Sequence, residues 1–200
     1  MTDEQAREDI AFIRRALEEG RVYAVGCSSD LLIWGVAVAI GHFATYAFVR
    51  GWATVPPNWL WTAAIGLPWI YSLRRLWSGG AGNAAPRASS PMVMALRMLW
   101  LGCGIFLTTL AIAATWTDEM RFGWFNAVAA GVLGIGVFTT AWLAGLPWLR
   151  WVGVAWWLGE LLLYGLRQRP EAILVAGVLT LVLLAGPGIA LVARRTRRFA

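Results

Sequence analysis

Glu160 is an acidic side chain inside a long apolar run, between Gly159 and Leu161. If that run crosses a membrane, an acid at this depth is costly unless it is neutral, paired or hydrated. Two roles fit such a residue. It can carry protons or ions along a polar path, or it can act as a protonated hydrogen-bond donor that holds two helices together.

His42 and Arg97 are the other two polar residues in unusual places. His42, the single histidine, follows Gly41 in another apolar run, where a structural hydrogen bond is the commoner role. A proton relay between His42 and Glu160 requires their two helices to touch. Arg97 lies about one turn inside a third run, and snorkelling of its guanidinium to the membrane surface explains it. An ion pair between Arg97 and Glu160 is the alternative.

The composition excludes several kinds of chemistry. All 17 basic residues are arginine, so the chain cannot form a lysine Schiff base or a P-loop lysine contact. One histidine is too few for a two-histidine haem or a three-histidine zinc site in one chain. We expect Cys27 and Cys103 to be small buried side chains without a disulfide. No catalytic set of residues stands out, so we expect no enzyme activity, no cofactor and no metal.

The chain has 14 tryptophans, and most are expected at the two membrane interfaces. Five are expected deeper, where they could line an aromatic pocket for an apolar or cationic ligand. These five are Trp34, Trp100, Trp142, Trp156 and Trp157. The alternative, which we favour, is that they face lipid or fill gaps between helices.

The elements that must position these residues are long apolar runs. Hydrophobic residues make up 59% of the 200 residues and charged residues 14%. A run of about 20 apolar residues crosses a bilayer as a helix. The sequence therefore predicts an all-α integral membrane protein with a six-transmembrane-helix bundle at residues 28–200. The predicted spans are 31–49, 55–73, 93–116, 122–146, 151–166 and 172–193, and residues 78–91 form a flexible cytoplasmic loop.

Residues 1–27 are predicted to contain a cytoplasmic amphipathic helix. A capping box formed by Thr2 and Gln5 starts this helix at residue 2, and Gly20 is expected to end it. Ala6, Ile10, Ile13 and Leu17 form one apolar stripe. Six acidic residues face four arginines here, so the helix should not bind anionic lipid readily. We expect Ile10, Ile13 and Leu17 to dock on the cytoplasmic face of the same chain or on a partner.

Arginine counting predicts the orientation. With the N-terminus inside, 13 arginines fall in cytoplasmic segments and four outside, at Arg50, Arg121, Arg167 and Arg169. Both termini are therefore expected in the cytoplasm of a bacterial inner-membrane protein. The first span is expected to serve as its own insertion signal. The final cluster, Arg194–Arg198, is interpreted as a topology anchor that can bind anionic headgroups.

Three spans end in similar motifs and suggest an internal repeat. The second contains Gly66-Leu67-Pro68-Trp69, the fourth Gly145-Leu146-Pro147-Trp148 and the sixth Gly186-Pro187-Gly188. A proline inside each span would bend it near its cytoplasmic end. The repeat unit would then be a helical hairpin occurring three times in parallel. The alternative is that glycine and proline are simply common in membrane helices.

Pairs of small residues four apart indicate close helix contacts, within the chain or in a homo-oligomer. The pairs are Ala37 with Gly41, Ala127 with Gly131, and Ala130 with Gly134. Because few polar residues lie in the spans, we expect a non-enzymatic accessory, sensory or regulatory subunit that engages a protein partner on its cytoplasmic face, without binding nucleic acid. The alternative is a small-solute or ion transporter or channel that uses Glu160 and His42.

Overall fold

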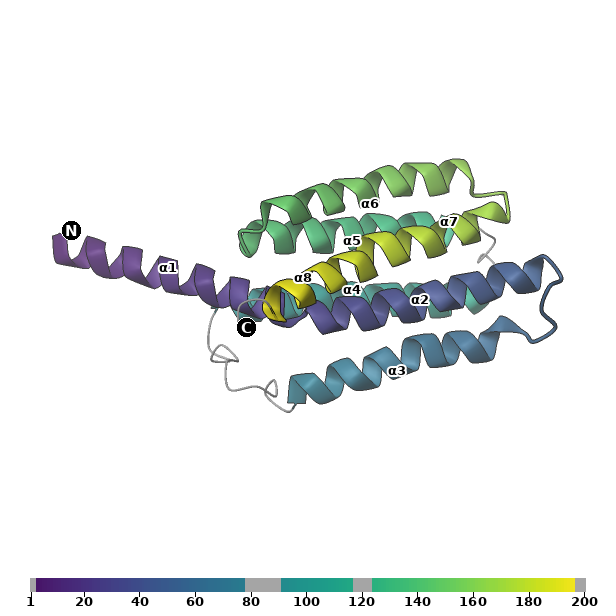
Figure 1. The fold of residues 1–200 in the computed structure, drawn as a ribbon, viewed down its shortest axis with the longest axis horizontal. Helices are drawn as coiled ribbons and strands as arrows, with labels where there is room; N and C mark the ends of the chain where they lie inside the picture. The colour runs from purple at the N-terminus through teal and green to yellow at the C-terminus, as the bar shows by residue number, and fades with distance from the viewer. Residues whose placement is uncertain (1–2, 78–90, 117–123, 197–200) are drawn as a thin grey trace.

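The computed structural model describes residues 3–77, 91–116 and 124–196, in which every regular element is helical. The helices are α1 (Asp3–Gly26), α2 (Ser28–Val49), α3 (Pro57–Trp77), α4 (Pro91–Trp116), α5 (Trp124–Leu143), α6 (Pro147–Gly165), α7 (Glu171–Thr180), the π-helical segment η1 (Leu181–Ala185) and α8 (Gly186–Thr196). Helices α2 to α8 lie side by side, while α1 projects from one end of this bundle, called the α1 end below (Figure 1). Thr2, residues 78–90 of the predicted loop, and residues 122–123 of the fourth span lie outside the described residues.

Prolines begin three of the bundle helices. Pro57, Pro91 and Pro147 are the first residues of α3, α4 and α6. Proline suits this position because its fixed φ is helical and the first turn has no partner for its missing N–H. The helix starts are therefore encoded locally, and each lies within a few residues of the predicted span.

Four helical stretches are long and apolar enough to cross a membrane. They are Asp3–Val49, which joins α1 and α2, then Pro91–Ala113, Trp124–Leu143 and Glu171–Ala193. The chain is thus all-helical in the described residues and carries four helices with the length and composition of membrane spans. Helices α3 and α6 are not among them, because four tryptophans, two charged residues and at least one proline in each lower their mean hydropathy.

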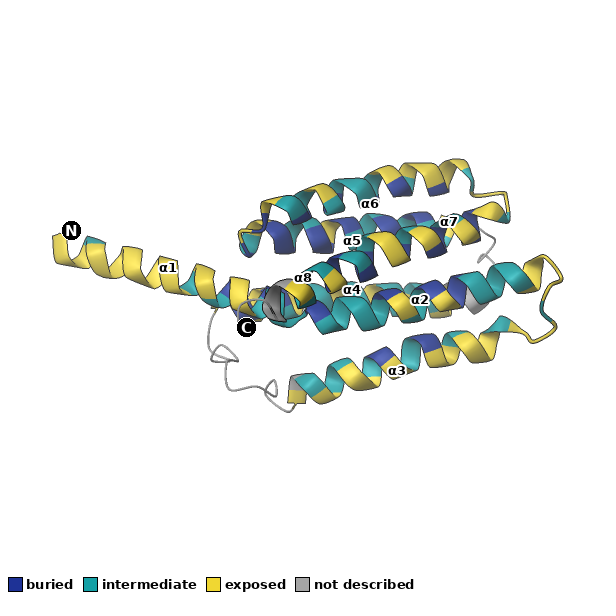
Figure 2. Cartoon of the chain, viewed as in Figure 1, coloured by how far each residue is buried: buried dark blue, intermediate teal, exposed yellow. Residues whose placement is uncertain are grey.

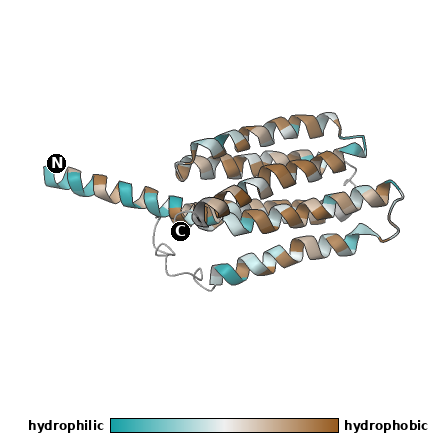
Figure 3. Cartoon of the chain, viewed as in Figure 1, coloured by the Kyte–Doolittle hydropathy of each residue, from teal (hydrophilic) through white to brown (hydrophobic). Residues whose placement is uncertain are grey.

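The bundle exposes apolar side chains along its length. Ile105 and Phe106 of α4 and Leu158 and Leu161 of α6 are all about half exposed or more. In the described part of the chain, the core between the helices consists of alanine, leucine and valine side chains together with Trp156. Hydrophobic residues cover the bundle helices and hydrophilic residues cover α1 (Figure 3). An apolar exterior of this kind is compatible with insertion into a membrane, whereas in water it would be a large exposed hydrophobic patch.

Helix α1 is longer than the sequence predicts. Gly20 does not end it, and the helix continues to Gly26. Gly20 is buried because α4 packs there, and a Cβ added to Gly20 would lie 2.5 Å from Cγ of Met92. The glycine therefore serves a close helix contact, and the prediction of a helix stop was wrong.

The apolar stripe of α1 does not dock on any other described part of the chain. The exposed fractions are 52% for Ile10, 56% for Ile13 and 46% for Leu17, and most of α1 is exposed (Figure 2). The prediction of docking on the cytoplasmic face of the same chain was therefore wrong. The helix packs on the bundle only near its end, through buried Gly20 and Ala24. Docking on a partner stays a prediction.

The two Gly-Leu-Pro-Trp motifs occupy different structural positions. Pro68 lies inside α3, where it is fully buried. Pro147 instead begins α6, after a turn in which Gly145 adopts a left-handed conformation with φ of 62°. Helix α5 has already ended at Leu143. The expectation that a proline bends each even span was therefore wrong for the fourth, and these motifs do not mark equivalent points of a repeat.

Helices α7, η1 and α8 form one continuous stretch, called the last helix below. Helix α2 crosses this last helix at very close range. A Cβ added to Gly35 would lie 2.5 Å from the backbone N of Ala185, and one added to Gly188 would lie 2.7 Å from the backbone N of Leu32. The π-helical segment η1 lies at this crossing, just before Pro187. Pro187 has no backbone N–H to donate. The π-helical turn of η1 comes just before this missing donor.

Candidate functional site

Arg75 joins three helices at the α1 end of the bundle. The guanidinium, at the end of α3, forms an ion pair with Asp30 in the first turn of α2. Its other terminal nitrogen donates to the carbonyl oxygen of Gly26, the last residue of α1. One side chain therefore holds the junction at Cys27, where α1 ends and α2 begins.

Both contacts suit the helix ends that meet there. The last carbonyls of a helix lack internal partners, and a cation stabilises their partial negative charge. An acid such as Asp30 stabilises the first turn of the following helix. Arg75 and Asp30 are only 29% and 22% exposed, so the pair is shielded from water more than an ordinary surface salt bridge. Asp30 precedes the predicted span 31–49; burial raises the pKa of this carboxyl group, and Arg75 opposes that effect.

The hydrogen bonds continue from Asp30 into the bundle. The indole N–H of Trp34 donates to Oγ of Ser72 over 3.1 Å. The Ser72 hydroxyl in turn donates to Oδ1 of Asp30 over 3.5 Å, a long and weak bond. The resulting chain of polar groups links α2 to α3 and ends at Arg75. We call Trp34, Ser72, Asp30 and Arg75 the junction cluster.

One cation–π contact lies beside the junction cluster. The Arg97 guanidinium of α4 lies over the Tyr23 ring of α1, with 5.3 Å between guanidinium carbon and ring centroid. No ion pair between Arg97 and Glu160 is found in the described residues. Cys27 and Cys103 are free thiols. Burial, with a smaller contribution from Asp30, raises the pKa of Cys27 to about 11, which makes this thiol a weak nucleophile at neutral pH.

The junction cluster was not predicted from the sequence, although a signal for it was present. Asp30 comes just before the first predicted span and Arg75 just after the second. In a helical hairpin these two positions lie at the same end, so an acid and an arginine there are natural partners. Arg75 was interpreted only as a signal of membrane orientation, so its pairing with Asp30 was not predicted.

Glu160 lies at the interface between α5 and α6. A Cβ added to Gly131 of α5 would lie 2.9 Å from Oε2 and 3.0 Å from Oε1 of Glu160. The carboxyl group therefore packs directly on the α5 backbone, where only a glycine leaves room. Three residues further along α5, Gly134 makes the same space for the Trp157 ring. No hydrogen-bond partner faces Glu160 among the described residues.

His42 is buried, and each ring nitrogen lies within hydrogen-bonding distance of an oxygen atom. Nδ1 lies 2.9 Å from the carbonyl oxygen of Val38, and Nε2 lies 3.1 Å from the side-chain Oδ1 of Asn126 in α5. The Trp61 ring of α3 meets the imidazole edge to face, with centroids 5.0 Å apart. This arrangement makes His42 a link between α2, α3 and α5.

The structure does not bring His42 and Glu160 together. His42 contacts α5 at Asn126 and Glu160 contacts it at Gly131. Five residues of an α-helix turn about 140°, so the two side chains approach different sides of α5. A direct proton relay between them has no support in this arrangement.

The five deep tryptophans contact different partners. Trp34 donates to Ser72, Trp100 to the hydroxyl of Thr140 over 3.0 Å, and Trp156 to the carbonyl oxygen of Leu183 over 3.2 Å. Trp157 packs on Gly134, while Trp142 is 55% exposed with Arg150 above its ring. The first four positions fit the filling of gaps between helices, whereas the exposed Trp142 fits a side chain on the outer surface of the bundle.

The Trp156 bond has a particular structural role. Leu183 lies four residues before Pro187, so its carbonyl would face the missing N–H of proline in a regular α-helix. The Trp156 indole supplies a donor from α6 instead. Trp61 and Trp69 also form bonds between helices, because they donate to the hydroxyls of Thr45 and Thr108. Such interhelical bonds stabilise helix packing in lipid.

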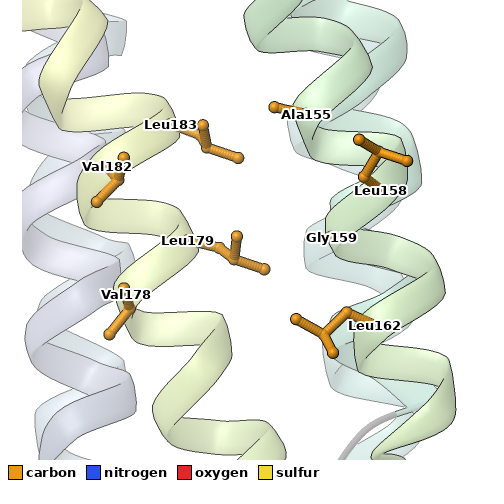
Figure 4. Close-up of a pocket in the computed structure, with 8 residues that line it drawn as sticks. All are labelled: Ala155, Leu158, Gly159, Leu162, Val178, Leu179, Val182 and Leu183. Carbon is orange, nitrogen blue, oxygen red and sulfur yellow. The ribbon is translucent and has the colours of Figure 1, made fainter.

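An apolar groove lies between α6 and the last helix (Figure 4). Its volume is about 330 Å³, and Leu158 and Leu162 of α6 face Val178, Leu179 and Val182 across it. No polar side chain lines this groove, which therefore offers nothing that would orient a substrate. Among residues 3–77, 91–116 and 124–196, no group of three or more histidine, cysteine or acidic side chains could hold a metal ion.

The fold and these sites define an α-helical protein with four helices of membrane-spanning length and a polar junction where a projecting helix joins the bundle. No protein-family model matches the sequence, and no curated protein or solved structure is significantly similar to it.

Proposed function

We propose that the chain is a non-enzymatic six-span protein of a bacterial inner membrane that acts as an accessory, sensory or regulatory subunit through α1. The observation that carries this proposal is the exposed apolar stripe on a helix that projects from the bundle (Figure 1). Ile10, Ile13 and Leu17 form a continuous apolar face that the described residues leave uncovered. An uncovered face of this kind is typical of a surface that binds a partner.

The proposal of six spans is supported by the length of α3 and α6. They contain 21 and 19 residues, which correspond to about 31 and 28 Å and match the hydrocarbon thickness of a bilayer. Each also contains four tryptophans. Tryptophan lowers a hydropathy average, yet it is favourable at membrane interfaces.

The distribution of arginines supports a cytoplasmic position for α1. Arg74, Arg75, Arg97 and Arg150 lie toward the α1 end of the bundle, while Arg50, Arg167 and Arg169 lie toward the opposite end. Loops rich in arginine face the cytoplasm. Both termini would then lie inside, where α1 meets cytoplasmic proteins.

The junction cluster would connect partner binding to the bundle. Because Arg75 contacts the end of α1 and the start of α2, a partner that reorients α1 must strain or break these contacts. A change in the orientation of α1, the projecting arm of the molecule, would thereby alter the contacts of α2 and α3. This connection favours a sensory or regulatory role over a purely passive anchor.

Transport of a small solute or an ion is the second candidate function. Glu160 and His42 approach different sides of α5, and the groove beside α6 is lined by apolar side chains alone. A hydrated route needs polar lining groups along its length. These observations favour a structural role for His42, and they place Glu160 at a tight helix contact without a polar path beside it.

Photocrosslinking in living cells tests the proposed function. Benzoylphenylalanine is placed at Ile13 or, as the matched control, at Phe12, which is 64% exposed but lies on another side of α1. We expect Ile13 to give an ultraviolet-dependent adduct with another protein and Phe12 to give none. Adducts from neither position, or equally from both, would contradict a partner-binding stripe.

A further inference from the structure

The apolar stripe of α1 has the spacing of a coiled-coil seam. Ala6, Ile10, Ile13 and Leu17 are separated by steps of four, three and four residues, as core positions of a heptad are. Met92 of α4 closes the same face at Gly20. The open seam therefore spans the 12 residues from Ala6 to Leu17, or about 18 Å, which is the length of one short helix contact.

One flank of this seam is basic. Arg7, Arg14 and Arg21 recur every seven residues, each directly after an apolar or glycine position of the seam. In a coiled coil these flanking positions form salt bridges to the facing helix and select the partner. All three arginines are exposed, and none forms an ion pair with a described residue. The opposite flank carries a single acid, Asp9.

A second copy of α1 fits this seam poorly. In a parallel pair the two seams would face each other, yet Gly20 and Ala24 continue the seam onto the bundle of the same chain. Both bundles would then compete for the space between the two helices. An antiparallel pair would place the arginine flanks against each other, which is repulsive. A lipid surface also fits poorly, because α1 is net acidic.

We infer that the seam binds an amphipathic helix of a partner protein that carries acidic side chains in register with Arg7 and Arg14. This inference rests on the proposed function, since it specifies the chemistry of the partner for the same helix. Apolar residues of the partner cover Ile10, Ile13 and Leu17, and its acids pair with the basic flank. Charge complementarity then discriminates among the many amphipathic helices in a cell.

The test uses the full chain in nanodiscs and two synthetic three-heptad peptides with leucine and isoleucine cores. One carries glutamate at the flanking positions and the other carries arginine there. At low ionic strength, we expect fluorescence anisotropy to show about tenfold tighter binding of the glutamate peptide. Ile13→Asp should abolish this binding, whereas Phe12→Asp on another side of α1 should not.

A matched pair of charge reversals tests the register. Arg14→Glu should weaken binding of the glutamate peptide about threefold or more and favour the arginine peptide. Arg15→Glu makes the same charge change one residue further on, away from the seam, and should change binding far less. Equal binding of the two peptides, or equal effects of the two variants, would overturn the inference.

The outcomes separate this inference from the proposed function. Adducts from Ile13 in cells without any charge preference among the peptides would overturn the acidic-helix partner and leave partner binding intact. An adduct at Ile13 with twice the mass of the chain would identify a second copy and overturn the inference. A charge preference without any adduct in cells would contradict the proposed function alone.

Discussion

Arg75 makes its contacts with two residues that are close in sequence but belong to different helices, Gly26 and Asp30. The ion pair is partly shielded, so removing the guanidinium leaves a half-buried acid without its opposing charge. The same change frees a helix-end carbonyl. Both of these side-chain contacts at the junction therefore come from one residue of α3.

Arg75→Gln is therefore expected to loosen the junction. We expect a loss of about 1–2 kcal/mol in unfolding free energy, seen as a lower melting temperature in detergent, and faster proteolysis near Cys27. Arg74→Gln is the matched control, because Arg74 is exposed and forms no ion pair with a described residue. Equal melting temperatures for the two variants would argue against a structural role for the Arg75 contacts.

For single residues, the sequence identified the candidate functional side chains better than it predicted the residues that they contact. Glu160 and His42 were identified from their depth, and both lie at helix interfaces. Their partners, Gly131 and Asn126, depend on which helix faces which, and apolar periodicity does not determine that. Glycine contacts are especially hard to predict, because a missing side chain carries no chemical signal of its partner.

The helices themselves were largely predictable, because long apolar runs and initial prolines are local signals. The errors have physical causes in the packing. Gly20 would favour a helix end in isolation, yet α4 packs on it and the helix continues. The second Gly-Leu-Pro-Trp motif forms a turn because Gly145 adopts a positive φ that the first copy, inside α3, does not need.

The crossing of α2 over the last helix gives a prediction at the element scale. Gly35→Ala would bring a methyl group against the backbone of Ala185, where no side-chain rotation can relieve it. We expect a loss of about 2 kcal/mol or more and a clearly lower melting temperature. Gly102→Ala, in α4 with open space around it, should be neutral or slightly stabilising because alanine favours helix formation. Equal melting temperatures would show that this crossing is looser than described.

At the scale of the whole molecule, α1 is the feature that distinguishes this chain from a bare bundle. Its first part is exposed and charged, whereas the bundle is apolar on its outside (Figures 2 and 3). The sequence predicted this division between a polar arm and an apolar domain. It could not predict that the arm stands clear of the bundle, because an amphipathic stripe is equally consistent with docking on the same chain.

The proposed cytoplasmic position of α1 depends on the membrane topology of the bundle. Single cysteines at Ala11, Thr54, Arg74 and Gln168, in a background with Cys27→Ala and Cys103→Ala, sample the arm and both ends of the bundle. With six spans, a membrane-impermeant maleimide should label Thr54→Cys and Gln168→Cys in intact cells. Ala11→Cys and Arg74→Cys should react only after the membrane is permeabilised. Labelling of Ala11→Cys in intact cells, or protection of Gln168→Cys, would contradict the account.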